Sequence, residues 1–203
     1  MIKLIVGLGN PGKNYQEHRH NAGFWFVESL ATLNSSKFTS QSKFVGETCS
    51  FSLSSTKIFL LKPQTYMNNS GGSIKSFLNY YDISPEETLV VHDELDLPTG
   101  TVKIKLGGGH GGHNGLRDII KAVGSQNFYR LRIGIGHPGS KDEVIDYVLN
   151  APSKIELSAI QESMSRASNI IELLVKGSFE DAMKALHTSV SYTHLTLPTI
   201  LLV

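Results

Sequence analysis

Two residues with the chemistry of a general base and its orienting partner stand far apart in this sequence. His20 follows a glycine-rich loop, and Asp93 comes at the end of an apolar run over residues 88–92. A histidine titrates close to neutral pH and can take a proton from water, while a neighbouring carboxylate holds it in one tautomer. Each residue alone is also typical of a structural position, such as a turn or a helix cap. Together they predict a water-activating pair, provided that the fold brings them into contact.

Asparagines in three separate glycine-rich loops offer side-chain amides beside the ends of expected strands. Asn10 lies in the first loop, Asn68 and Asn69 in the second, and Asn114 in the third. Helix capping is the default explanation for an asparagine that directly precedes a helix. Amide N–H groups at strand ends can also donate to a carbonyl oxygen or to a developing oxyanion. The sequence leaves both explanations open.

Residues 7–12, Gly-Leu-Gly-Asn-Pro-Gly, match the G-x-G-x-x-G pattern of dinucleotide-binding loops. Such a loop must open onto a helix packed on the sheet, and an acidic residue about 20 positions further on must bind the ribose. Residues 13–20 contain no apolar stripe, and the matching acid, Glu28, falls within an expected helix. The pattern therefore favours a loop in which glycines allow a close approach and the Asn10 amide is offered at a strand end.

Other catalytic chemistries have less support. The only cysteine, Cys49, has no polar setting that would activate it, and the chain contains no G-x-S-x-G or H-E-x-x-H motif. His92, His110 and His113 could in principle ligate a metal, but their spacing is not specific for one. Water activated by a histidine is the chemistry that remains.

Alternating strand and helix patterns must position these side chains. Apolar or alternating runs predict strands at residues 2–6, 57–62, 88–92, 101–106 and 130–135. Apolar residues at helical spacing predict helices after residue 21, at 74–81, at 116–123, from 153 to 177 and at 179–186. Asn21 is a candidate N-cap, and Ser153 with Glu156 forms a capping box. This order of elements predicts an α/β domain that includes the C-terminal helices.

Composition limits the class of protein further. With 203 residues, 40% hydrophobic and 18% charged, the chain suits one globular domain and not a disordered segment. A single cysteine excludes a disulfide framework, and no apolar run approaches the ~20 residues that span a bilayer. We therefore expect a soluble protein of a reducing compartment, the cytoplasm, that has no membrane partner.

The last residues do not fit this pattern. From Ala185 to Val203 there is no Asp, Glu, Lys or Arg, and the helical period disappears. Residues 190–199 resemble a translated sequencing-adapter read-through. We expect the domain to comprise residues 1–188, with native sequence ending near Thr188, and residues 189–203 to be a non-native or disordered tail.

The formal net charge of +1 conceals one strongly basic segment. Residues 101–141 contain a single acidic residue, Asp118. The basic residues of this segment are Lys103, Lys105, Arg117, Lys121, Arg130, Arg132 and Lys141. Clustered cations favour contact with phosphates through counterion release. A solvated surface whose acids lie elsewhere in the chain is the alternative.

Several motifs, in order, resemble those of bacterial peptidyl-tRNA hydrolases. They are residues 7–12 with Tyr15 and Arg19-His20-Asn21, Met67-Asn68-Asn69-Ser70-Gly71, His92-Asp93-Glu94-Leu95-Asp96, residues 107–116 and residues 130–136. The resemblance runs from Met1 to about Leu186, so it is far more specific than any one motif. It implies a monomeric α/β domain with a twisted mixed β-sheet flanked by helices. It also implies an esterase that cleaves the bond between a peptide and the 3′-terminal ribose of tRNA, without a metal or a cofactor, and so recycles tRNA from prematurely released peptidyl-tRNA.

The resemblance implies catalytic and ester-binding roles for five residues. His20 is then the general base that activates water, and Asp93 orients it. Asn10 and Asn68 hold the peptide and the ester region. Asn114 positions the water or the peptide backbone.

The resemblance also implies where the acceptor end of the tRNA lies. Tyr15 and Met67 line the groove near the tRNA terminus, and His113 is adjacent to them. The expected phosphate-binding cluster consists of Lys103, Lys105 and Arg132, which gives the basic segment a function. His18 departs from the family, which more often has a small hydroxyl residue there, and this makes the local histidine titration harder to interpret.

Three other functions remain distinguishable by experiment. A nicotinamide-dependent enzyme built on the first glycine loop would bind that cofactor. A non-catalytic RNA-binding module would use the basic strands alone and would release no peptide. A metallohydrolase would lose activity on exhaustive chelation.

Overall fold

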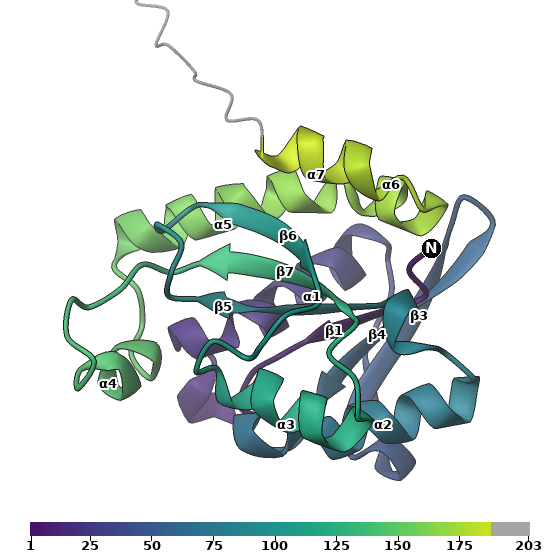
Figure 1. The fold of residues 1–203 in the computed structure, drawn as a ribbon, viewed down its shortest axis with the longest axis horizontal. Coiled ribbons are helices and arrows are strands. Elements are labelled where there is room, and N and C mark those ends of the chain that lie inside the picture. Colours follow the sequence, from purple (N-terminus) through teal and green to yellow (C-terminus); the bar gives the residue numbers. More distant parts are fainter. Residues whose placement is uncertain (188–203) are drawn as a thin grey trace, which may run out of the picture.

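The computed structural model describes residues 1–187 of the protein, so the tail expected at 189–203 lies outside the described residues. In the described part, a seven-stranded sheet has the strand order β2-β3-β4-β1-β5-β7-β6 (Figure 1). The strands are β1 (Leu4–Gly7), β2 (Thr39–Gln41), β3 (Gly46–Leu53), β4 (Thr56–Pro63), β5 (Thr88–Glu94), β6 (Val102–Leu106) and β7 (Tyr129–Gly134).

The direction of the central strands brings several loops to one edge of the sheet. β1 pairs in parallel with both β4 and β5, and β5 pairs in parallel with β7. β6 is antiparallel to β7, and β2 and β3 extend the other side in antiparallel fashion. The carboxyl ends of β1, β4 and β5 therefore lie side by side, which is where ligands bind in open α/β sheets.

Helices cover both faces of this sheet (Figure 1). The α-helices are α1 (Ala22–Leu33), α2 (Ser70–Tyr81), α3 (Asn114–Val123), α4 (Val144–Val148), α5 (Lys154–Ser168), α6 (Ile171–Lys176) and α7 (Phe179–His187). Short 3₁₀ turns are η1 (Lys13–Tyr15), η2 (Arg19–Asn21), η3 (Ser42–Phe44), η4 (Met67–Asn69) and η5 (Pro85–Glu87). The α/β class with a mixed sheet flanked by helices is confirmed.

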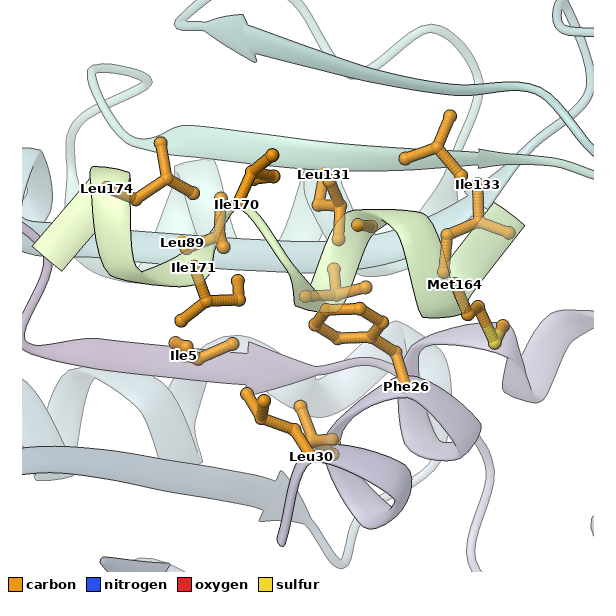
Figure 2. Packing of buried hydrophobic residues seen from close by; sticks show 14 of the residues in the cluster. Ile5, Phe26, Leu30, Leu89, Leu131, Ile133, Met164, Ile170, Ile171 and Leu174 are labelled. Atoms are coloured by element: carbon orange, nitrogen blue, oxygen red, sulfur yellow. The ribbon is translucent and has the colours of Figure 1, made fainter. Parts of the chain in front are cut away.

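Two hydrophobic clusters, one on each face, explain why the central strands are apolar throughout. Ile5 of β1 packs with residues of α1, α5 and α6, as the close view in Figure 2 shows. Its neighbours Leu4 and Val6 pack on the other face with residues of α2 and α3. Successive strand residues point to opposite faces, so a strand covered on both sides reads as a continuous apolar run.

Three glycines allow α1 to pack directly against β1. A Cβ atom added to Gly7 would lie 2.3 Å from the backbone oxygen of Gly23, and one added to Gly9 would lie 2.6 Å from the ring of Phe24. The first glycine loop leads into η1 and η2 rather than into a helix. The close approach expected of these glycines is therefore an approach of helix to strand, and the loop lacks the geometry of a dinucleotide-binding turn.

Several local predictions need correction. Asn21 is at the N-cap position of α1, as predicted, but its side chain makes no capping hydrogen bond to that helix. The helix expected from residue 153 to Gly177 is divided into α5 and α6 by Asn169 and Ile170, although its capping box is present. β5 continues past residue 92 to Glu94, so Asp93 belongs to the strand.

Three elements were not predicted from the sequence. β2 and β3 carry mostly polar, partly exposed residues at the edge of the sheet, and α4 is only five residues long. Neither type of segment has a clear hydrophobic period. Within the described residues, no helix combines the length and apolar character that crossing a bilayer requires.

The contact between α1 and the sheet is open to a direct test. A Cβ at Gly23 would lie 2.3 Å from the backbone oxygen of Val91 and 2.4 Å from the backbone nitrogen of Leu8. Gly23→Ala must move α1 away from the sheet, so we expect the free energy of unfolding to fall by about 1–3 kcal/mol. Urea denaturation measures this change.

Gly72→Ala is the matched control, because Gly72 lies in α2 and a Cβ there meets nothing within 4 Å. Replacing a helical glycine in open space raises stability by up to ~1 kcal/mol. Equal urea midpoints for Gly23→Ala and Gly72→Ala would contradict the close packing of α1 on the sheet.

Candidate active site

His20 and Asp93 lie in direct contact at the carboxyl edge of the sheet. The His20 Nδ1 atom is 2.9 Å from both carboxylate oxygens of Asp93. Asp93 comes from the end of β5, and His20 comes from η2 immediately before α1. Asp93 is buried, with 3% of its surface exposed. The packing of α1 on β1 and β5 therefore sets the distance between the two side chains.

The contact fixes the protonation pattern of His20. A carboxylate only accepts hydrogen bonds, so His20 Nδ1 carries the hydrogen and Nε2 of the neutral ring has a free lone pair. Burial by itself lowers the pKa of His20, but the charge of Asp93 and the hydrogen bond to it outweigh burial and raise this pKa above its ordinary value. His20 lines a cleft of about 680 Å³ and can accept a proton there when neutral.

His113 is a second donor to the same carboxylate. Its Nδ1 atom accepts hydrogen bonds from the backbone N–H groups of Gly115 at 3.1 Å and Leu116 at 3.3 Å. Nδ1 must then be unprotonated, so the hydrogen is on Nε2, which donates to Asp93 Oδ1 at 3.0 Å. His113 rather than Asn114 is thus the N-cap of α3, which corrects the capping explanation for Asn114.

The two histidines keep Asp93 ionised in a buried position. Burial alone would raise the pKa of this carboxyl, but the electrostatic interactions with His20 and His113 and the hydrogen bonds that both rings donate lower it. His92, on the other side of His113, donates from Nδ1 to the backbone oxygen of Asp93 at 2.6 Å. Burial and the neighbouring His113 lower the pKa of His92 to about 3, so it is neutral.

Asn10 presents amide donors to the cleft. Its Oδ1 atom accepts the backbone N–H of Met67 at 2.8 Å, which identifies the oxygen and leaves Nδ2 without a partner among the described residues. Asn21 holds the loop by exchanging two hydrogen bonds with the backbone of Asn10, at 2.9 and 3.0 Å. This contact, rather than helix capping, is the role of Asn21.

Asn114 and Asn68 also line the cleft. The Oδ1 atom of Asn114 accepts from Arg117 Nη1 at 3.2 Å, so its amide N–H groups are again the atoms left for a ligand. Asn68 lies in η4 and is exposed, and neither it nor Asn69 caps α2 through its side chain. The amides of three loops therefore meet in one cleft, as donors to an acceptor-rich ligand.

An apolar wall that the sequence did not predict faces these polar groups. It consists of Leu95, Val144, Ile145, Val148 and Leu149. The buried Arg19 attaches this wall to the site, because its Nη1 donates to the backbone oxygens of Tyr147 and Asn150 at 3.2 Å. Its Nη2 also donates to Glu156 Oε2 at 3.1 Å. The only signal in the sequence was the position of Arg19 next to His20.

The remaining residues expected near the tRNA terminus also lie at the cleft. Tyr15 packs edge to face against Tyr66, with ring centroids 6.1 Å apart. Met67 is buried, and its backbone N–H holds Asn10. Tyr66 is exposed at the cleft and was not predicted.

The basic residues Lys103, Lys105 and Arg132 lie outside this cleft, on β6 and β7. Lys103 stands opposite Arg132 and Lys105 opposite Arg130 in the antiparallel pair, so all four side chains project from one face. Both lysines are exposed. Arg132 Nε donates to Glu94 Oε2 at 2.8 Å, which leaves its terminal nitrogens without a partner in the described part of the chain.

His20, Asp93 and His113 are also the group of described residues whose donor atoms come close enough to surround a metal ion. The protonation pattern argues against such a site. A neutral histidine that ligates through Nε2 must carry its hydrogen on Nδ1, but Nδ1 of His113 faces two backbone N–H donors. Metal binding there would break the capping hydrogen bonds of α3. These three side chains therefore suit a hydrogen-bonded group better than a metal site.

Known proteins similar to this chain place it in a family. A family model described as peptidyl-tRNA hydrolase matches residues 4–193. The peptidyl-tRNA hydrolase of Ruthia magnifica subsp. Calyptogena magnifica is 56% identical over 187 residues, which cover 92% of this chain and 98% of that protein. That of Dichelobacter nodosus is 53% identical over 188 residues, covering 93% and 100%. The crystal structure of peptidyl-tRNA hydrolase from Acinetobacter baumannii superposes with a TM-score of 0.90 at 47% identity, covering 92% of this chain and 95% of that one.

The resemblance found in the sequence is thus confirmed, and the chain belongs to the peptidyl-tRNA hydrolase family, a family of hydrolases.

Proposed function

We propose that this protein hydrolyses the ester between a peptide, or another N-blocked aminoacyl group, and the 3′-terminal ribose of tRNA. The observation that carries the proposal is the contact between His20 and Asp93, with His20 Nε2 at the cleft. Family membership supports the same substrate. In this role the enzyme recycles tRNA from prematurely released peptidyl-tRNA.

The proposed reaction begins with a water molecule at His20 Nε2. His20 takes a proton as the water oxygen attacks the ester carbonyl carbon, and Asp93 stabilises the imidazolium that forms. The resulting oxyanion accepts hydrogen bonds from the side-chain amides of Asn10 and Asn68, and Asn114 positions the water or the peptide backbone. The C–O bond to the ribose then breaks, and His20 returns its proton to the leaving ribose oxygen. No step needs a metal or a cofactor.

The acceptor end of tRNA is proposed to follow the line from the cleft to β6 and β7. Tyr15, Met67 and His113 lie near the reacting end, whereas Lys103, Lys105 and Arg132 bind tRNA phosphate. Glu94 supports this assignment of Arg132, because it holds Nε and leaves the terminal nitrogens for an anion. We further propose that the protein acts as a monomer, as the sequence resemblance implies, and peptidyl-tRNA as substrate supports a cytoplasmic location.

Removing the general base tests the central assignment. We expect His20→Ala to lower kcat by on the order of 10²–10⁴-fold, because proton transfer from water is lost. Binding of uncharged tRNA should stay within about twofold, since His20 is not among the residues proposed to contact tRNA phosphate. The measurement is release of N-acetylaminoacyl groups from tRNA, with tRNA binding followed by fluorescence anisotropy.

The same assay with exhaustive chelation separates this enzyme from a metallohydrolase, which would lose activity. If His20→Ala turns over substrate about as fast as the wild-type protein, His20 is not the general base. Peptide release by the wild-type protein excludes a module that only binds RNA.

The pH profile tests the role of Asp93. A base must be unprotonated, so kcat/KM of the wild-type enzyme should rise with pH through the raised pKa of His20. In Asp93→Asn the charge is gone and burial remains, so the pKa of His20 should fall and the rising limb should move to lower pH. The rate on the plateau should also fall, because an amide N–H facing Nδ1 favours the wrong tautomer. A rising limb at the same pH in the variant and the wild-type enzyme would contradict the role assigned to Asp93.

The phosphate cluster makes a separate prediction. Lys105→Ala and Arg132→Ala should raise KM while leaving kcat within about twofold, because these residues contact phosphate and not the ester. Each variant should also reduce the slope of log affinity against log salt by about 1. Lys37→Ala, which changes an exposed lysine outside the basic segment, is the control. An unchanged salt slope for both cluster variants would argue against phosphate contact.

A further inference from the structure

Arg130 belongs to the basic segment but cannot serve as a phosphate ligand in the way that its neighbours can. It is 3% exposed, on the same sheet face as Lys105. Its Nη1 donates to the backbone oxygen of Gly109 at 2.6 Å, and its Nη2 donates to the backbone oxygen of Gly108. A buried guanidinium is thus committed to two successive carbonyls of the loop that joins β6 to α3.

This contact determines where the amide groups of the loop point. Every peptide bond of the described chain is trans, so each N–H points away from the carbonyl of the preceding residue. With the carbonyls of Gly108 and Gly109 turned towards Arg130, the N–H groups of Gly109 and His110 point away from it. Neither N–H has a hydrogen-bond partner among the described residues. Gly109 is exposed, and adjacent N–H groups of this kind form an anion-binding nest.

The charge around the loop favours the same ligand. The Nζ atom of Lys105 lies 2.9 Å from the position that a Cβ of Gly108 would occupy, so its ammonium group rests on the loop. No carboxylate forms an ion pair with Lys105 or Arg130 within residues 1–187. One exposed cation, Lys105, and two amide donors without a partner among the described residues therefore adjoin one surface site, while the neighbouring carboxylate of Glu94 is held by Arg132.

We infer that the backbone amides of Gly109 and His110, together with Lys105, bind a phosphate group of the RNA substrate, and that Arg130 is the positioning residue that shapes this loop. The inference rests on the proposed function. It adds main-chain donors to the phosphate-binding cluster of Lys103, Lys105 and Arg132. Arg130 supports the loop that carries these donors. The phosphate is either the 5′-terminal monoester or a backbone diester of the acceptor end.

One pair of variants at residue 109 isolates the amide. Gly109→Pro removes the N–H, whereas Gly109→Ala keeps it and places a Cβ where nothing lies within 4 Å and the backbone φ is not positive. We measure the affinity of each for a 5′-phosphorylated acceptor-stem minihelix. Gly109→Ala should bind within about twofold of the wild-type protein, and Gly109→Pro roughly tenfold more weakly, as loss of a hydrogen bond to a charged group implies. Equal affinities for the two variants would overturn the inference.

Two further readouts exclude a merely structural effect. In hydrolysis of N-acetylaminoacyl-tRNA, the defect of Gly109→Pro should lie in KM, with kcat retained; a loss of kcat instead would mean that the loop itself is displaced and would overturn the inference. The penalties of Gly109→Pro and Lys105→Ala should combine to less than their product, because both groups hold one phosphate. Fully multiplicative penalties would refute a shared site.

A 5′-hydroxyl minihelix identifies the source of the phosphate. If the 5′-terminal group is bound, Gly109→Pro should weaken binding of the phosphorylated minihelix only; if a backbone diester is bound, both minihelices should lose affinity equally. Failure of the wild-type protein to release N-acetylaminoacyl groups would refute the proposed function itself. Normal release, with no difference between Gly109→Pro and Gly109→Ala, would refute only the phosphate-binding loop.

Discussion

A buried carboxylate that must be satisfied by two donors organises this structure. Asp93 is almost inaccessible at the end of the central strand β5, and an ionised group in such a place costs several kcal/mol unless donors surround it. His20 reaches Asp93 from the side of the sheet that α1 covers, and His113 reaches it from the first turn of α3 on the opposite side. The carboxylate is therefore satisfied only when both helical layers have packed on the sheet. The site is complete only in the fully packed fold.

The orientation of the polar side chains depends on rigid backbone groups. The N–H of Met67 fixes the amide of Asn10, and the first turn of α3 fixes the tautomer of His113. Each contact occupies an acceptor atom and leaves a donor, which is Nδ2 of Asn10 at the cleft and Nε2 of His113 at Asp93. Such prior orientation means that little reorganisation is needed when negative charge develops on a substrate. The same contacts make the cleft rich in donors, which suits the carbonyl oxygens of a peptide and its ester.

The sequence predicted the central strands and the major helices because a strand or helix covered on one or both faces leaves a hydrophobic period. It could not predict β2, β3 or α4, whose residues are half exposed or too few to show one. The motifs identified the candidate residues that line the cleft, and the parallel strand order explains why distant motifs meet there. The roles of Asn21 and His113 could not be predicted from the sequence, because helix caps and hydrogen bonds between distant segments use the same residue types. Only the three-dimensional register shows that Asn21 binds the Asn10 loop and that His113 caps α3.

On charge alone, the four basic residues of β6 and β7 would have the same role. Their exposure to solvent differs, however, and separates one of them from the other three. Lys103 and Lys105 are exposed and Arg132 is partly exposed, whereas Arg130 lies beneath the loop of residues 107–113. That loop begins beside Lys105 and ends at His113, which donates to Asp93. His110 stabilises the loop from within, because its Nδ1 accepts the N–H of Gly112 at 3.0 Å and its backbone oxygen accepts the N–H of His113 at 2.9 Å. A short, internally bonded segment thus connects the basic strands to the buried carboxylate. Because its two ends are fixed by Arg130 and Asp93, an RNA phosphate bound on the basic side, as proposed above, would lie at a defined distance from His20. Binding of the RNA and alignment of its ester would then be parts of one geometric constraint.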